Sequence, residues 1–260
     1  MKQLEISLRI KNLREKMLSE PRYASIEQAK IITETYKANE NKPRIIQRAL
    51  ALKAALEKME IRIETGELIV GNRTAGVRAG VVFPESGSTW VDKEFEDLPT
   101  RPQDKFNIHE EDIKIFRAEI KPYWEGKSLE DILKKRYGAE IAEISKVAKI
   151  NQTDHAQGHI CPDCKLWLKV GAAGLKAQAD EKFKTATGDK KIFYEGVSIA
   201  MEGVQNFMKR YAELAKKCQS KLRTRRLNWN LKKFLKTARH LPNVRQKLFG
   251  NPFNQFGFCS

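Results

Sequence analysis

The chain has 260 residues, of which 41% are hydrophobic and 32% are charged, a balance typical of globular proteins. Its apolar runs fall well short of the roughly 20 residues that a membrane-spanning helix needs, and its first residues form no apolar signal core. We therefore expect a cytoplasmic protein with no membrane contact, and its four cysteines are too few for a disulfide framework. The net charge of +16 is uneven, because residues 221–260 contain ten Lys or Arg and no Asp or Glu. Such a tail could bind nucleic acid by neutralising phosphates.

The first predicted elements are two helices. Ser25 followed by Gln28 has the spacing of a capping box, which predicts a helix through about Ala38. Pro43 suits the first position of the next helix, because that position needs no backbone N–H donor. One face of this second helix is predicted to carry Ile45, Ala49, Leu52, Leu56 and Met59.

The next segment is predicted to be mainly irregular. Ile61 and Ile63 alternate with charged residues, and the apolar run at 68–70 between two glycines predicts a short buried strand. Residues 72–107 are rich in Gly, Pro, Ser and Thr and show little regular periodicity. A loop of that length should be ordered by contacts with other parts of the protein.

Helices dominate the rest of the chain. One should begin with the acidic residues at 110–112 and carry Phe116 and Ile120 inward, and Ser128 should cap another. Apolar residues repeat at helical spacing over 163–183, and the strongest pattern covers 191–217. That last stripe consists of Phe193, Val197, Ala200, Val204, Phe207, Tyr211 and Leu214. The sequence thus predicts a mostly α protein with short strands.

The segment 151–164, NQTDHAQGHICPDC, concentrates reactive side chains. Cys161 and Cys164 with His155 or His159 could bind a metal, but a structural zinc site usually has a second ligand pair, and the sequence has none. A redox pair would need a thioredoxin-like strand before it, which is also missing. The Pro and Asp between the cysteines suit a helix start, so we expect both cysteines simply to pack and no metal to bind.

Five segments together resemble the N-terminal region of glycyl radical enzymes of the pyruvate formate-lyase family. They are KPRIIQRALALKAALEKMEIRIETGELIVGNRT, VFPESGSTWVDKEFEDLPTRPQDKFNIHEEDIKIF, YWEGKSLEDIL, NQTDHAQGHICPD and MKRYAELAKK. They occur in the family's order and spacing over about residues 20–218. The resemblance is closest to the dehydratase-like branch, which includes glycerol and diol dehydratases and choline lyase.

The resemblance implies a fold and an activity for the complete protein. Residues 1–220 would form the helical N-terminal part of a ten-stranded α/β barrel. A radical S-adenosylmethionine activase would install a glycyl radical, and a cysteine thiyl radical would take hydrogen from a small hydroxylated or amino-alcohol substrate. The complete enzyme would be a homodimer. The family's radical glycine and central cysteine lie beyond residue 260, so this chain alone should bind no cofactor and be inactive, with no catalytic residue of its own.

The resemblance also implies two substrate-binding residues. In the dehydratase branch an Asn and a His eight residues apart, in a segment ending Gly-His, line the substrate pocket. Here they correspond to Asn151 and His159, whose amide and imidazole groups can hydrogen-bond a hydroxylated substrate.

The basic tail departs from the family after about Ser220. Reading the codons of residues 249–259 one base out of frame permits WESIQSIWFL, which resembles the family's next helix. We therefore interpret 221–260 as an out-of-frame peptide. The alternative is a basic nucleic-acid-binding protein, which the first 220 residues do not favour because they contain no binding motif.

Overall fold

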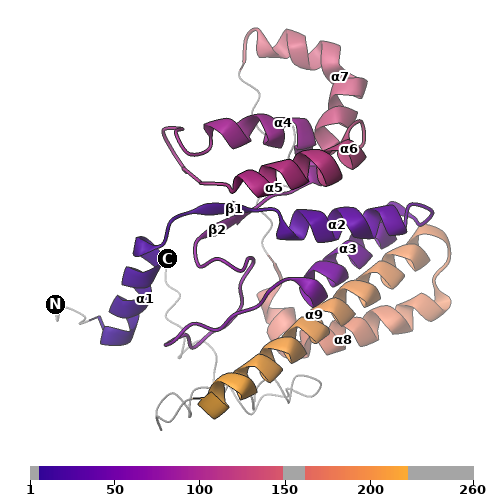
Figure 1. The fold of residues 1–260 in the computed structure, drawn as a ribbon. Helices are drawn as coiled ribbons and strands as arrows, with labels where there is room; N and C mark the ends of the chain where they lie inside the picture. The colour runs from indigo at the N-terminus through magenta and orange to yellow at the C-terminus, as the bar shows by residue number, and fades with distance from the viewer. Residues whose placement is uncertain (1–5, 149–161, 222–260) are drawn as a thin grey trace. The chain divides into compact units, whose positions relative to one another are not determined.

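The computed structural model of the chain describes residues 6–148 and 162–221, and helices make up most of this part (Figure 1). This confirms the predicted mostly helical composition. By their contacts the described residues form two compact units, one made of 6–39, 58–61 and 72–148 and the other of 40–57, 62–71 and 162–221. Within the described residues, no helix combines the length and the apolar character needed to cross a membrane.

A small parallel pairing opens the first unit. After helix α1 (Leu8–Ser19), strand β1 (Tyr23–Ser25) pairs in parallel with β2 (Ala79–Val81), in the register Tyr23↔Ala79. On the other side of β1, Tyr23 also bridges to Asn107 in parallel. Three segments far apart in the sequence are therefore joined by backbone hydrogen bonds.

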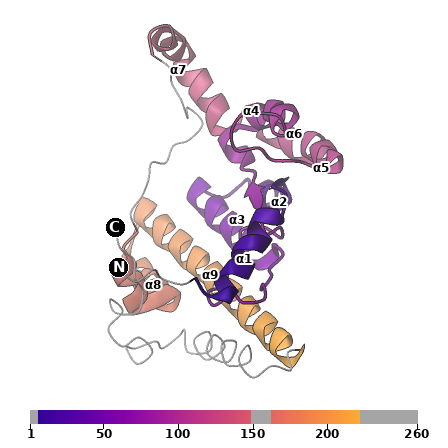
Figure 2. The same cartoon turned by 90° about the vertical axis from the view of Figure 1, so that its left-hand side faces the viewer.

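The core of the first unit lies where α2 (Glu27–Ala38) meets a broken helix. That helix consists of α5 (Glu110–Ile115), a π-helical turn η1 (Phe116–Ile120) and α6 (Lys121–Trp124), and α4 (Pro84–Asp97) packs beside it (Figures 1 and 2). Phe116 and Ile120 are completely buried, as predicted. The Phe116 ring packs edge-on against Phe95 of α4, with ring centroids 4.9 Å apart. The indole of Trp124 donates a buried hydrogen bond of 2.8 Å to the hydroxyl of Thr33 in α2.

Helix α7 (Leu129–Ser145) leaves this core with a well-formed cap. The Ser128 hydroxyl accepts from the Asp131 amide at 3.2 Å and donates to the Asp131 carboxylate at 2.7 Å, which confirms the predicted start. The helix bends at Tyr137, whose backbone is not helical. Glu130 is buried although it is charged, because Lys134 and the Trp90 amide contact its carboxylate.

The second unit is built from α3 (Arg44–Lys58), α8 (Cys164–Thr185) and α9 (Gly188–Lys221). Helices α8 and α9 lie side by side and are joined by a turn at Gly188, which takes the left-handed conformation with φ of 55°. Lys176 and Asp180 of α8 both hydrogen-bond the Ser198 hydroxyl of α9, at 2.9 and 2.6 Å, and they also bond each other at 2.8 Å. On α9, Gly196 and Gly203 face α3 so closely that an added Cβ would lie 2.9 Å from Ile45 and 2.7 Å from Lys53.

Three local predictions are wrong. Ser25 lies in β1 and does not cap α2, and Gln28 instead donates to the Arg73 carbonyl. Residues 61–70 form no strand, and Ile69 is 79% exposed. Residues 72–107, expected to be irregular, contain both β2 and α4.

The predicted inner faces are only partly correct. Ile45 and Leu52 of α3 are nearly half exposed, while Ala51 and Ala55 of the same helix are buried. On α9 the stripe is buried at Tyr211 but 51% exposed at Phe193. Both of these helices were therefore predicted, but the sequence did not show which of their apolar residues the described structure covers.

Candidate functional site

The predicted substrate-binding residues, Asn151 and His159, lie outside the described residues. His155 and Cys161 also lie outside the described residues, so the structure does not test whether this segment binds a metal or forms a redox pair. What it does describe is the chain on either side of the segment.

Both flanking helices begin at capped residues. Upstream, α7 starts at the Ser128–Asp131 cap described above. Downstream, the Asp163 carboxylate accepts from the Leu166 amide at 2.9 Å and caps α8, as the sequence predicted. A capped helix start is worth about 1 kcal/mol and fixes the point at which the chain enters the helix, so only the Asp163 cap adjoins the segment directly. The segment that carries Asn151 and His159 is thus connected to regular structure on each side.

Cys164 corrects one expectation. It is the first residue of α8 and its side chain is exposed, so it does not pack in a core. The helix start itself is as predicted, because Asp163 provides the cap. Among the described residues there is no group of three or more His, Cys, Asp and Glu side chains that could hold a metal ion.

The best-developed charged cluster of the first unit holds α4 against η1 and α6. Asp92 of α4 accepts from Arg117 at 2.7 Å and from Lys121 at 2.6 Å, and Arg117 also contacts Glu96 at 3.2 Å. Burial would raise the pKa of Asp92, but the hydrogen bonds from Lys121 and Arg117 outweigh it and lower that pKa below its ordinary value. Both Asp92 oxygens are occupied by these cations, so the cluster supports the packing of the helices.

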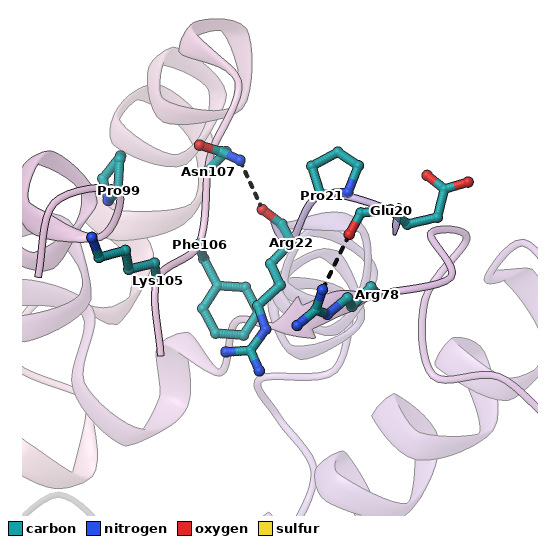
Figure 3. Close-up of a pocket in the computed structure, with 8 residues that line it drawn as sticks. All are labelled: Glu20, Pro21, Arg22, Arg78, Pro99, Lys105, Phe106 and Asn107. Carbon is teal, nitrogen blue, oxygen red and sulfur yellow. Dashed lines mark hydrogen bonds between the residues drawn. The ribbon is translucent and has the colours of Figure 1, made fainter. Parts of the chain in front are cut away.

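A hollow of about 430 Å³ lies next to the β1–β2 pairing of the same unit (Figure 3). It is lined by Glu20, Pro21, Arg22, Arg78, Pro99, Lys105, Phe106 and Asn107. Three of these side chains are cationic and one is anionic. The Arg22 guanidinium lies over the Phe106 ring, 5.5 Å from its centroid.

Backbone hydrogen bonds hold two of the three cationic positions of this hollow, Arg22 and Arg78. The Arg22 carbonyl accepts from the Asn107 amide at 2.8 Å, and the Arg78 carbonyl accepts from the Tyr23 amide at 3.3 Å. Sequence reasoning did not find this group, because the three cations lie in separate segments with no motif spacing. Only the pairing of β1 with β2 and with Asn107 brings them together.

Comparison with known proteins gives a consistent result. A family model described as "Pyruvate formate lyase-like" matches residues 1–245, a range that extends into the basic tail. The chain is 30% identical over 228 residues to (2S)-3-sulfopropanediol dehydratase of Klebsiella oxytoca. The aligned region covers 82% of this chain but only 27% of that protein.

Solved structures agree with the sequence comparison. The B12-independent glycerol dehydratase from Clostridium butyricum, solved in a glycerol-bound form, superposes with a TM-score of 0.85 at 29% identity. The match covers 93% of this chain and 32% of the dehydratase. A glycyl radical enzyme from Archaeoglobus fulgidus gives a TM-score of 0.82 at 28% identity, over 90% of this chain and 31% of that one. The chain therefore spans about a third or less of these relatives, and the comparisons give no support to the nucleic-acid alternative.

Proposed function

The chain belongs to the pyruvate formate lyase-like family, and we propose that it forms the N-terminal part of a glycyl radical dehydratase or lyase acting on a small hydroxylated or amino-alcohol substrate. The observation that carries this proposal is the likeness to the glycerol dehydratase over 93% of the chain. The relatives named as dehydratases support the same reaction class. The described residues would then serve as scaffold, because they form packed helices and include neither the radical glycine nor the central cysteine of the family.

We further propose that Asn151 and His159 bind the substrate in the complete enzyme. An amide offers both a donor and an acceptor, and an imidazole can donate to or accept from a substrate hydroxyl. The resemblance of NQTDHAQGHICPD to the family's segment ending in Gly-His supports this assignment. His155, which lacks the Gly-His context, would have a smaller role.

The radical chemistry would require parts that these 260 residues do not supply. In the complete enzyme a cysteine thiyl radical would abstract hydrogen from the substrate, and a radical S-adenosylmethionine activase would install the glycyl radical that this needs. We propose that the chain alone is inactive, and that the complete enzyme is a cytoplasmic homodimer. Electron paramagnetic resonance after treatment with an activase tests the first statement. A glycyl radical signal on the 260-residue polypeptide would overturn it.

The tail from residue 221 is proposed to be an out-of-frame peptide. Its charge supports this, because ten basic and no acidic residues follow 220 residues of mixed charge. The DNA downstream of codon 220, read in three frames, tests the idea. Continuation of the family's sequence in another frame is expected, and continuation in the same frame past codon 260 would contradict it.

The decisive experiment uses the full-length enzyme with a restored frame. His159→Ala should lower turnover about tenfold to hundredfold, because a substrate hydroxyl would lose a buried partner worth roughly 1–3 kcal/mol. If His159 also moves a proton to the departing hydroxyl, the loss should be about 10²–10⁴-fold. The glycyl radical should still form, and His155→Ala is the matched control. Equal losses from the two substitutions, or loss of the radical in His159→Ala, would show that His159 is not the substrate ligand.

A further inference from the structure

The hollow beside β1 and β2 carries an excess of positive charge. Arg22, Arg78 and Lys105 line it together with only one acidic residue, Glu20 (Figure 3). It lies wholly within the first unit and contains neither of the two proposed substrate-binding residues. Its chemistry can therefore be considered independently of the proposed enzymatic reaction.

Two of the three cations have hydrogen-bonding capacity to spare. Arg78 donates from Nη1 to the carbonyls of Leu18 and Glu20, at 3.3 and 3.4 Å. Among the described residues its Nε and Nη2 have no acceptor, and the Lys105 ammonium has none either. A guanidinium has five N–H donors and an ammonium has three, so both could bind an added oxyanion.

The third cation already binds an oxyanion that belongs to the chain. Arg22 pairs with the Asp104 carboxylate at 3.2 Å, and the Asp104 side chain is 74% exposed. An exposed pair of this kind contributes only about 0–1 kcal/mol, so a ligand carrying an oxyanion could compete with it. Asp104 thus shows what chemistry Arg22 accepts and also occupies part of that capacity.

The walls of the hollow suit the carbon part of such a ligand. Phe106 is half buried, and Gly80 approaches its ring so closely that an added Cβ would lie 3.0 Å away. Pro21 and Pro99 add two rigid apolar surfaces. A hollow of about 430 Å³ falls within the range of pockets that hold small molecules. Backbone pairing fixes the main chain at Arg22 and Arg78, so ordering on binding would be confined to side chains.

From these features we infer that the hollow is a binding site for a small molecule that carries a phosphate or carboxylate group. The oxyanion binds Arg78, and the carbon body packs against Phe106. Lys105, which lies on the other side of the Phe106 ring from Arg78 (Figure 3), adds positive charge at the far edge of the hollow. Asp104 competes with the ligand for Arg22.

The test measures binding to the full 260-residue chain by NMR, following backbone amides at constant ionic strength set with sodium chloride. The probes are inorganic phosphate, succinate and phenyl phosphate, so that the two oxyanions and the contribution of an apolar body are distinguished. Shifts confined to the lining residues are expected, with phenyl phosphate binding more tightly than inorganic phosphate. Shifts spread over the whole basic surface, or no saturable shift with any probe, would overturn the proposal.

Charge variants make the test specific. Lys105→Gln and Arg78→Gln should each weaken binding by about threefold to fivefold, the effect of losing one partly exposed charged contact. Asp104→Asn should strengthen binding by a similar factor, and Asn tolerates the left-handed backbone at this position, where φ is 48°. Lys93→Gln removes the same charge from an exposed lysine of α4 that does not line the hollow, and it should leave binding unchanged.

Two outcomes of this series would contradict the site. One is a loss for Lys93→Gln equal to that for Lys105→Gln, which would mean that only the overall field attracts the anion. The other is weaker binding in Asp104→Asn. Lys105 and Asp104 are both exposed, so these variants remain informative even if Arg78→Gln disturbs the backbone that it supports.

Discussion

Replacing Gly203 with alanine should loosen the second unit. Gly203 is buried on α9, and an added Cβ would lie 2.7 Å from the Cα of Lys53 and 3.0 Å from its Cβ. Because the nearest atom belongs to the backbone of α3, one of the two helices must move. Overpacking of this kind costs about 1–3 kcal/mol, while alanine regains up to about 1 kcal/mol of helix propensity. The net expectation is a loss of about 1–2 kcal/mol in the stability of the α3–α9 contact.

Other contacts along the same interface show what the displacement would strain. Lys53 pairs with Glu202 at 3.0 Å, next to Gly203 in the sequence. Further along, Asn206 donates to the Glu57 carboxylate and Arg210 donates to the Leu56 carbonyl, each at 2.6 Å. A shift of α9 away from α3 would lengthen all three contacts, so the effect should extend beyond the site of substitution.

Hydrogen exchange measured by mass spectrometry on peptides from α3 and α9 is the appropriate assay, because it reports local opening free energies. Gly196→Ala should cost less, since its nearest neighbour is the side-chain Cγ2 of Ile45, which is 48% exposed and can turn away. Gly138→Ala in α7 is the matched control, because nothing lies within 4 Å of its added Cβ. It should leave exchange in α3 and α9 unchanged. Unchanged or slower exchange in α3 for Gly203→Ala would refute the close-packing argument.

Three further predictions concern the charges, the core and the surface. Burial opposes the shift, but Lys121 and Arg117 lower the pKa of Asp92 below its ordinary value of 3.8, so the stability that its carboxylate contributes should be lost as the pH falls below about 4. In acid unfolding, the stability of Asp92→Asn should therefore depend less on pH in that window than that of the unchanged chain. Identical pH profiles for the two proteins would count against this. Trp124→Phe should lower the free energy of unfolding by about 1 kcal/mol in denaturant titration, because the Thr33 hydroxyl loses the indole N–H that donates to it. An unchanged free energy would mean that this hydrogen bond contributes nothing. The chain should bind dyes specific for exposed apolar surface, or self-associate, because apolar side chains of α8 and α9 such as Leu168 and Phe193 are more than half exposed. A monomer that unfolds sharply and binds no dye would contradict this.

The sequence was sufficient for features that depend on residues close together in the chain. The helical stripe of α9 repeats over many turns, so its periodicity identified the helix, although its start lies a few residues earlier than predicted. Ser128 and Asp163 were identified as helix starts because a cap involves only a side chain and a backbone amide three residues away. The family was recognisable for a similar reason, since its segments recur in order along the chain.

Short apolar segments were predicted less well. Three apolar residues at 68–70 suggested a strand, but a strand also needs a partner, and none of the described residues pairs with them. The same limit hid β1 and β2, whose pairing joins residues more than fifty positions apart. Helix α4 was missed because glycine, proline and serine in its first turns concealed Val91 and Phe95, which are buried at helical spacing.

The sequence by itself therefore determined the family, the helical composition and the capped starts of the helices on either side of the segment with Asn151 and His159. Only the tertiary structure decided which glycines meet a neighbouring helix and which cations gather around one hollow. The physical reason is that periodicity and capping are local properties of the chain. Close approach and shared charge depend instead on residues that folding brings together, as it does for Lys53 with Gly203 and for Arg22 with Arg78.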